Sequence, residues 1–155
     1  MKKKIIFFTG NRAEYGLQMP IIKSIKNNHN FKTFVVVSGS HLDQNYGNTI
    51  SAIKKDKIKI DAEIKFKYES NLDYTPKKVS LIINRMTDLL STIKPDMFFA
   101  YADRFETFGA VISASLMNIP VIHVEGGDIT FGGTHDDNMR HAISKLSHIH
   151  LTSTK

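Results

Sequence analysis

The sequence contains no cysteine and no apolar stretch long enough to cross a membrane. Without cysteine there are no disulfide bonds, thiolate zinc sites or cysteine nucleophiles, and a reducing compartment is a natural fit. A membrane-spanning helix needs about 18 apolar residues in succession. The basic start of the chain leads into an apolar run at residues 5–9 that is too short for the core of a signal peptide. These absences predict a cytoplasmic protein.

Arginine is also scarce, although the formal net charge is +6. The excess is mostly lysine, and eight lysines are scattered over residues 54–78, a pattern typical of a solvated surface rather than of a nucleic-acid interface. Three arginines instead lie beside glycine or carboxylate motifs, namely Arg12, Arg104 and Arg140. We therefore expect the ligand to be a small anionic molecule.

The composition is that of one globular domain, with 155 residues, 41% of them hydrophobic and 23% charged. Short apolar runs alternate with stretches of helical periodicity. Strands are predicted at residues 4–9, 32–38, 60–66, 97–100, 121–124 and 149–152. Helices are predicted at 49–54, 75–93, 105–116 and 136–146, and a first helix follows a turn at residues 10–16, with helical spacing from residue 19 to its end at 27. This alternation predicts an α/β fold, a Rossmann-like doubly wound parallel sheet over residues 1–155.

Charged residues follow the ends of four predicted strands. They are Arg12 and Glu14, then His41, then Asp103 and Arg104, and finally the acidic stretch from Glu125 to Arg140. Right-handed crossovers bring the carboxyl ends of parallel strands to one edge, so these turns are expected to share a cleft. The free amides at the helix start after residue 10 can bind a phosphate, and the Arg12 side chain would add further donors. The glycine spacing is not a dinucleotide fingerprint.

Charged residues and glycines are most concentrated at residues 121–141, where an apolar strand is followed by a glycine-rich turn, four acidic residues in all, and then Arg140 with His141. On a helix Asp136 lies four residues from Arg140, and Asp137 lies four residues from His141, so one aspartate is expected to pair with Arg140; the alternative is an ordinary surface ion pair. Several carboxylates in one cleft could hold a divalent metal, but the histidines lack a recognised ligand spacing. Crowded carboxylates also raise one another's pKa, as general acid–base catalysis requires.

Four motifs, in this order along the chain, resemble those of the hydrolysing UDP-N-acetylglucosamine 2-epimerases. They are GNRAEYG at residues 10–16, GSHL at 39–42 with YGNT at 46–49, ADRF at 102–105, and HVEGGD at 123–128 with DDNMRHAISKL at 136–146. The resemblance covers almost the whole chain. It departs from the family at Tyr101 and Ala102, where His-Gly is frequent, and in a slightly longer loop before Asp136.

The resemblance implies the N-terminal domain of a GT-B fold, whose second, nucleotide-binding domain is absent from this chain. It assigns Asp103, Glu125 and Asp136 as the catalytic carboxylates, without dividing the roles of acid, base and cation stabiliser. The substrate-binding residues that it implies are Arg12, Glu14, His41, Arg104, Asp128, Asp137, Arg140 and His141. It implies no cofactor and no metal, a UDP-sugar as substrate, a homo-oligomer in the full-length form, and neither nucleic acid nor membrane as partner.

The implied reaction converts UDP-N-acetylglucosamine and water to N-acetylmannosamine and UDP through a glycal, with the isolated chain inactive or nearly so. The alternatives are a UDP-N,N'-diacetylbacillosamine 2-epimerase of the hydrolysing kind, half of a non-hydrolysing epimerase, and a non-catalytic anion-binding module. We also expect Glu125 and Asp136 to be solvent-exposed and the loop between them to be mobile.

Overall fold

Six parallel strands form a single sheet in the computed structural model, which describes residues 1–47, 49–66, 73–128 and 135–153. The strands are β1 (Lys3–Thr9), β2 (Phe31–Val37), β3 (Ala62–Glu63), β4 (Met97–Tyr101), β5 (Val121–Val124) and β6 (Ile149–Leu151). Their order is β3-β2-β1-β4-β5-β6, so the direction of winding changes between β1 and β4. Open sheets of this kind bind ligands beyond that point. The predicted Rossmann-like doubly wound parallel sheet is confirmed.

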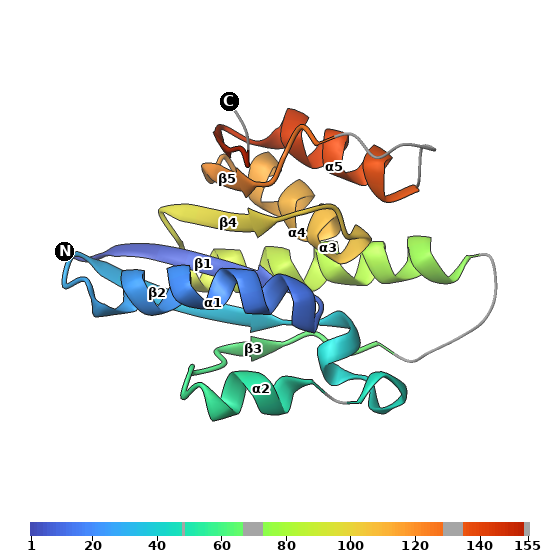
Figure 1. Cartoon of the computed structure of the whole chain (residues 1–155). Helices are drawn as coiled ribbons and strands as arrows, with labels where there is room; N and C mark the ends of the chain where they lie inside the picture. The colour runs from blue at the N-terminus through green and yellow to red at the C-terminus, as the bar shows by residue number, and fades with distance from the viewer. Residues whose placement is uncertain (48, 67–72, 129–134, 154–155) are drawn as a thin grey trace.

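Helices cover both faces of the sheet (Figure 1). Their bounds are α1 (Arg12–Asn27), α2 (Ile50–Lys55), α3 (Tyr74–Ile93), α4 (Phe105–Leu116) and α5 (His135–Leu146), with short 3-10 helices η1 (Gly39–Leu42) and η2 (Gln44–Tyr46). Successive β1 residues point to opposite faces: Phe7 packs with α1 and α2, whereas Phe8 packs with α3, α4 and α5. Both side chains are fully buried, and each contributes about 1.5–3 kcal/mol.

The predicted edge strand at residues 60–66 is too long, because only β3 (Ala62–Glu63) pairs with β2. Just before β3, the Asp61 carboxylate accepts a hydrogen bond from the Val35 amide at 2.9 Å. A side chain therefore satisfies a backbone donor that a longer strand would have paired. The other predicted elements are present. α1 begins at Arg12, inside the segment predicted as a turn, and the remaining bounds differ by one or two residues at most.

Small residues let α4 pack closely, and the partner of Gly109 is the helix α3. A β-carbon at Gly109 would lie 3.3 Å from Ile82 and from the Val79 carbonyl, both in α3. Ala110 and Ala114 are fully buried in the core between α4 and the sheet. α4 therefore fits closely between α3 and the strands, and its first turn is held at the carboxyl edge of the sheet.

Gly39, in the turn after β2, occupies a backbone position that no other residue fits. Its φ is +58°, and an added β-carbon would lie 2.4 Å from the Gly10 carbonyl oxygen. We expect Gly39→Ala to destabilise the domain by about 2–3 kcal/mol, combining left-handed strain with a backbone clash. Denaturant unfolding measures the loss.

The matched control for that substitution is Gly47→Ala. Gly47 has a φ of +79°, but its added β-carbon would meet nothing within 4 Å. Only the conformational cost, about 1 kcal/mol, is expected there. Equal losses for the two variants would show that the close approach of the turns after β1 and β2 is unimportant.

Within the part of the chain that the structure describes, no helix is both long and apolar enough to cross a membrane.

Candidate active site

Arg140 is the centre of an ion-pair cluster at the carboxyl edge of the sheet. Its Nη1 donates to Asp137 at 2.9 Å, and its Nη2 donates to the Asp103 carboxylate. Nη1 also donates to the backbone carbonyl of Asp128 at 2.9 Å. The Arg140 and Asp137 side chains are only 13% and 9% exposed. A guanidinium with two carboxylate partners and one carbonyl partner fixes the relative positions of these groups.

The expected ion pair of Arg140 with one aspartate of the helix is present, but that aspartate is Asp137, three residues away, and not Asp136 at four residues; Asp103 is a second partner. On a helix, spacings of three and four residues both permit contact. The strand end at Asp103 decides between them, because it places a second carboxylate beside Asp137. Asp136 itself is exposed at the start of α5, as expected.

Two turns at this edge contain non-glycine residues in the left-handed conformation. Ala102, just before Asp103, has a φ of +57°, and Glu125, just after β5, has a φ of +58°. Such backbone costs of order 1–3 kcal/mol at each residue and concentrates at functional sites. Ala102 directly follows β4 and Glu125 directly follows β5. The two strands therefore fix where Asp103 and Glu125 leave the sheet.

Glu125 is half-buried, which corrects the expectation that it would be exposed. Its amide donates to the Leu151 carbonyl at 2.9 Å, so the strand β6 holds its backbone. Burial and the neighbouring Glu125 carboxylate raise the pKa of Tyr101, whose side chain is buried at the end of β4. The phenol therefore stays protonated beside Glu125. Most of the loop before Asp136, expected to be mobile, lies outside the described residues.

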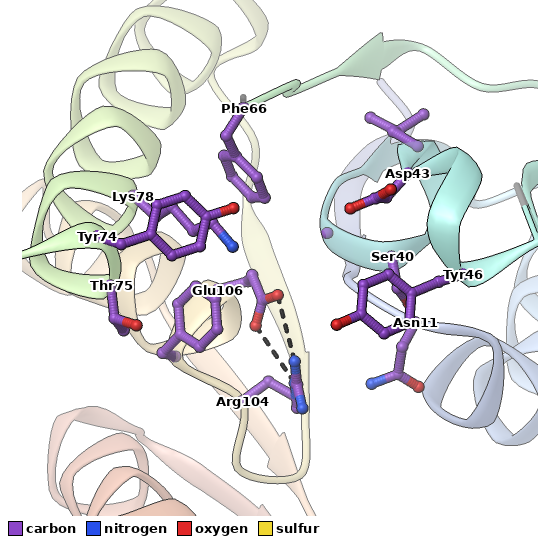
Figure 2. A pocket seen from close by; sticks show the side chains of 13 residues that line it. Asn11, Ser40, Asp43, Tyr46, Phe66, Tyr74, Thr75, Lys78, Arg104 and Glu106 are labelled. Atoms are coloured by element: carbon purple, nitrogen blue, oxygen red, sulfur yellow. Dashed lines mark hydrogen bonds and ion pairs between the residues drawn. The ribbon is translucent and has the colours of Figure 1, made fainter. Parts of the chain in front are cut away.

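A cavity of about 400 Å³ has Arg104 and Glu106 in its lining (Figure 2). One wall comes from the turns after β1 and β2, and the other from Phe66 and the first turns of α3 and α4. Lys78 lies over the Tyr74 ring at 3.7 Å and within about 5 Å of Phe66. Arg104 lines this cavity while its neighbour Asp103 faces Arg140. The turn after β4 thus joins the cavity to the ion-pair cluster.

Glu14 and Glu106 form a second, buried acidic group beneath the cavity. They are 3% and 2% exposed, and both lie against Gly10. Gly10 donates its amide to Glu14 Oε2 at 2.8 Å, and Arg104 pairs with Glu106 at 3.3 Å. Burial, partly offset by the Gly10 hydrogen bond, raises the pKa of Glu14 to about 8, and the Glu106 charge acts in the same direction. Glu14 therefore supports the first turn of α1 from inside.

Glu14→Gln is expected to change how stability depends on pH. Because the pKa of Glu14 is raised from 4.5 to about 8 on folding, the folded state keeps a proton that the unfolded state loses. The contribution of Glu14 to the free energy of unfolding therefore falls as pH rises from about 4.5 to about 8 and then levels off. Glutamine does not titrate and should remove this decline, which is about 5 kcal/mol at most for a pKa difference of this size; urea unfolding at pH 5, 7 and 9 measures it. Asp88→Asn, at an exposed site on α3, should leave the decline unchanged; a wild-type profile in Glu14→Gln contradicts the assignment.

His41 lies inside the protein rather than at the surface of the cleft. It has no exposed area, and its ring nitrogens contact the hydroxyls of Thr9 at 3.1 Å and Thr49 at 2.8 Å. Burial lowers its pKa to about 4, so the ring is neutral. In this arrangement His41 connects the turns after β1 and β2. It has no surface with which to touch a ligand.

The other predicted binding residues are spread around this edge. Arg12 is exposed and faces a separate hollow with Gly47 and Lys55. Asp128 is exposed and accepts hydrogen bonds from the Ser153 hydroxyl at 3.3 Å. His141 is exposed on α5. The structure therefore brings Asp103, Asp137 and Arg140 together, with Glu125 on the neighbouring strand end, but it does not place Arg12 or His141 among them.

Sequence reasoning missed Glu106 as a member of this region. The available signal was an acidic residue in the first turn of a helix that is otherwise apolar, which indicates a buried and paired carboxylate. Among the described residues, no group of three or more histidine, aspartate or glutamate side chains is arranged to hold a metal ion.

The fold and the site define a Rossmann-like α/β domain with a carboxylate-lined cleft at the carboxyl edge of its sheet. The sequence profile of the family described as UDP-N-acetylglucosamine 2-epimerase matches residues 23–155. The chain therefore belongs to the UDP-N-acetylglucosamine 2-epimerase family.

Curated relatives match the whole chain. It is 37% identical over 157 residues to the hydrolysing UDP-N,N'-diacetylbacillosamine 2-epimerase of Legionella pneumophila, covering 100% of this chain and 41% of that protein. It is 35% identical to the polysialic acid biosynthesis protein P7 of Escherichia coli, covering 99% of this chain and 39% of that protein. The chain thus spans about two fifths of the length of these relatives.

A solved structure has the same fold. The UDP-GlcNAc 2-epimerase of Neisseria meningitidis, crystallised with UDP-GlcNAc, superimposes with a TM-score of 0.85 at 24% identity. The superposition covers 96% of this chain and 39% of that one.

Proposed function

We propose that this chain supplies the N-terminal catalytic half of a hydrolysing UDP-N-acetylglucosamine 2-epimerase, which releases N-acetylmannosamine and UDP. The observation that carries the proposal is the convergence of Asp103, Asp137 and Arg140 beside Glu125, at the carboxyl ends of β4 and β5. The name of the Legionella relative favours a second substrate, UDP-N,N'-diacetylbacillosamine. The two sugars share a 2-acetamido group and a UDP leaving group, so the same chemistry serves both.

The chemical difficulty is the proton on C2, which has no adjacent carbonyl group. It becomes acidic only as the bond between C1 and the UDP oxygen breaks and positive charge grows on the ring. Carboxylates stabilise this cation and can accept the proton. Loss of UDP and of the proton leaves a glycal. Water then adds at C1, and C2 receives a proton on the opposite face, which inverts that centre.

In this proposal the carboxylates that act on the sugar are Asp103, Glu125 and Asp136. Arg140 pairs with Asp103 and so holds this carboxylate in place. Asp136 is exposed at the start of α5 and can meet a sugar held partly from outside this chain. Asp137, Asp128, Arg104, Glu14, His41 and His141 complete the proposed binding region, with Arg12 directed to the diphosphate. The buried residues Glu14 and His41 would act through the turns that they hold.

The rest of the proposal concerns the complete protein. A second domain of the same chain would hold most of the nucleotide, because the matched relatives extend well beyond the length of this one. The active form would be a cytoplasmic homo-oligomer, which gel filtration of the complete protein and cell fractionation can test. The isolated chain should bind UDP weakly, and calorimetry measures this directly.

The deciding assay incubates the complete protein with UDP-N-acetylglucosamine and, separately, with UDP-N,N'-diacetylbacillosamine in heavy water. We expect release of UDP and of a free sugar that carries deuterium at C2. A UDP-linked epimer without free sugar would identify a non-hydrolysing enzyme instead. A free sugar without deuterium would exclude the glycal route. Micromolar binding of UDP by this chain alone, without turnover in the complete protein, would indicate an anion-binding module.

A further inference from the structure

His123 connects three segments of the site from underneath. It lies in β5, two residues before Glu125, and it is fully buried. Its Nε2 is 2.8 Å from the Ala102 carbonyl oxygen, and its Nδ1 is 3.1 Å from the Ser144 hydroxyl in α5. One ring therefore joins the turn that carries Asp103, the strand end that carries Glu125 and the helix that carries Arg140.

The partners of the ring determine its tautomer. A carbonyl oxygen can only accept, so Nε2 must carry the proton and donate it to Ala102. Burial lowers the pKa of His123, which keeps the ring neutral. In the neutral ring Nδ1 has a lone pair, so the Ser144 hydroxyl donates to it. The hydrogen bonds thus run in one direction, from α5 through β5 to the end of β4.

Gly126 leaves no space for this pair to move. A β-carbon at Gly126 would lie 2.5 Å from His123 Nδ1 and 2.8 Å from the Ser144 hydroxyl oxygen. The backbone that follows Glu125 therefore lies directly against the hydrogen bond between the ring and the serine. A change in that hydrogen bond must shift the Glu125 turn, because protein interiors are too closely packed to absorb it elsewhere.

We propose that His123 and Ser144 form a positioning brace for the site, which holds the segments of Asp103, Glu125 and Arg140 at fixed separations. The brace is separate from the ion pairs of Arg140, which join two of the same segments near the surface. Neither His123 nor Ser144 needs to touch the sugar. The expected effect of the brace on turnover rests on the proposed function. The claim that the brace holds the three segments in position does not depend on that function.

Ser144→Ala tests the brace in the complete protein, because it removes the hydroxyl without adding bulk. We expect kcat to fall about 10- to 30-fold with KM within about twofold of wild type, since small displacements of catalytic groups reduce the rate more than the binding. Ser144→Thr keeps the hydroxyl and should retain kcat within about threefold. Backbone amide signals of Asp103 and Glu125 should shift in the alanine variant and much less in the threonine variant.

The matched control is Ser113→Ala. Ser113 is buried in α4 and donates its hydroxyl to the Ile83 carbonyl at 3.0 Å, so it joins two helices outside the site. It should lower the thermal midpoint about as much as Ser144→Ala while leaving kcat unchanged. If both variants keep wild-type kcat, the hydrogen bond is merely structural and the proposal is overturned.

Failure of the brace can be distinguished from failure of the proposed function. If the wild-type complete protein does not turn over either UDP-sugar, the proposed function is wrong. The backbone amide signals then test by themselves whether the brace positions the site. Shifts at Asp103 and Glu125 in Ser144→Ala, absent from Ser113→Ala, would then support it. Unchanged signals, or a His123 ring that is protonated on Nδ1 by nitrogen NMR, would overturn it whatever the activity.

Discussion

Replacing Glu125 with glutamine in the complete protein is expected to lower kcat by about three orders of magnitude or more, the upper range for loss of a positioned acid–base group. Glutamine has nearly the same shape and can occupy the same half-buried position after β5. It cannot accept the C2 proton, and it has no charge with which to stabilise a ring cation. KM should change little, because the substrate contacts of the ground state remain.

Steady-state release of UDP measures this effect, and Glu63→Gln provides the control. Glu63 is an exposed carboxylate in the edge strand β3, paired only with Lys65 among the described residues. That variant should have wild-type kcat. Residual deuterium exchange at C2 without UDP release in Glu125→Gln would assign the proton to another carboxylate. Wild-type turnover in Glu125→Gln would contradict the catalytic assignment altogether.

Replacing Arg140 with methionine is expected to reduce kcat/KM by about three orders of magnitude. Methionine keeps the length of the side chain but leaves the carboxylates of Asp103 and Asp137 beside each other without a cation. The two like charges then repel each other, so Asp103 should no longer be held in its present position.

Two further variants define the role of Arg140. Arg140→Lys keeps the charge but loses the fork that reaches both aspartates, so an intermediate loss of about 10- to 100-fold is expected. Arg85→Met, on the exposed face of α3, should have no effect on turnover. The measurement is kcat/KM between pH 6 and 9. If the lysine and methionine variants have the same activity and the same pH profile, charge compensation by Arg140 is not what the site requires.

Much of the fold could be predicted because its information is local. Apolar runs such as residues 121–124 and the helical periodicity of 105–116 agree with β5 and α4 as observed. The short β3 was the least predictable strand, since alternation over residues 60–66 is equally typical of an exposed segment. Whether such a segment pairs depends on its neighbour, and here the Asp61 side chain takes the amide of Val35.

The candidate site was predictable in its residue types and less so in its contacts. Asp103 and Arg140 are 37 residues apart in the sequence, so nothing in the helical spacing of Asp136 and Arg140 pointed to that pair. His41 follows a strand and was expected near the ligand, yet its ring contacts the hydroxyls of Thr9 at the end of β1 and Thr49 at the start of α2. Long-range partners of this kind appear only when separate turns meet.

The sequence by itself determined the parallel α/β class, the edge of the sheet at which the acids gather, and the family resemblance. These follow from periodicity and from motifs read within a few residues. Only the tertiary structure decided that Arg140 bridges Asp103 and Asp137, that Glu14 and His41 are buried, and that His123 joins three segments. The physical reason is that hydrogen bonds and pKa shifts depend on distances of a few ångströms and on burial, and both are set by packing between elements far apart in the chain.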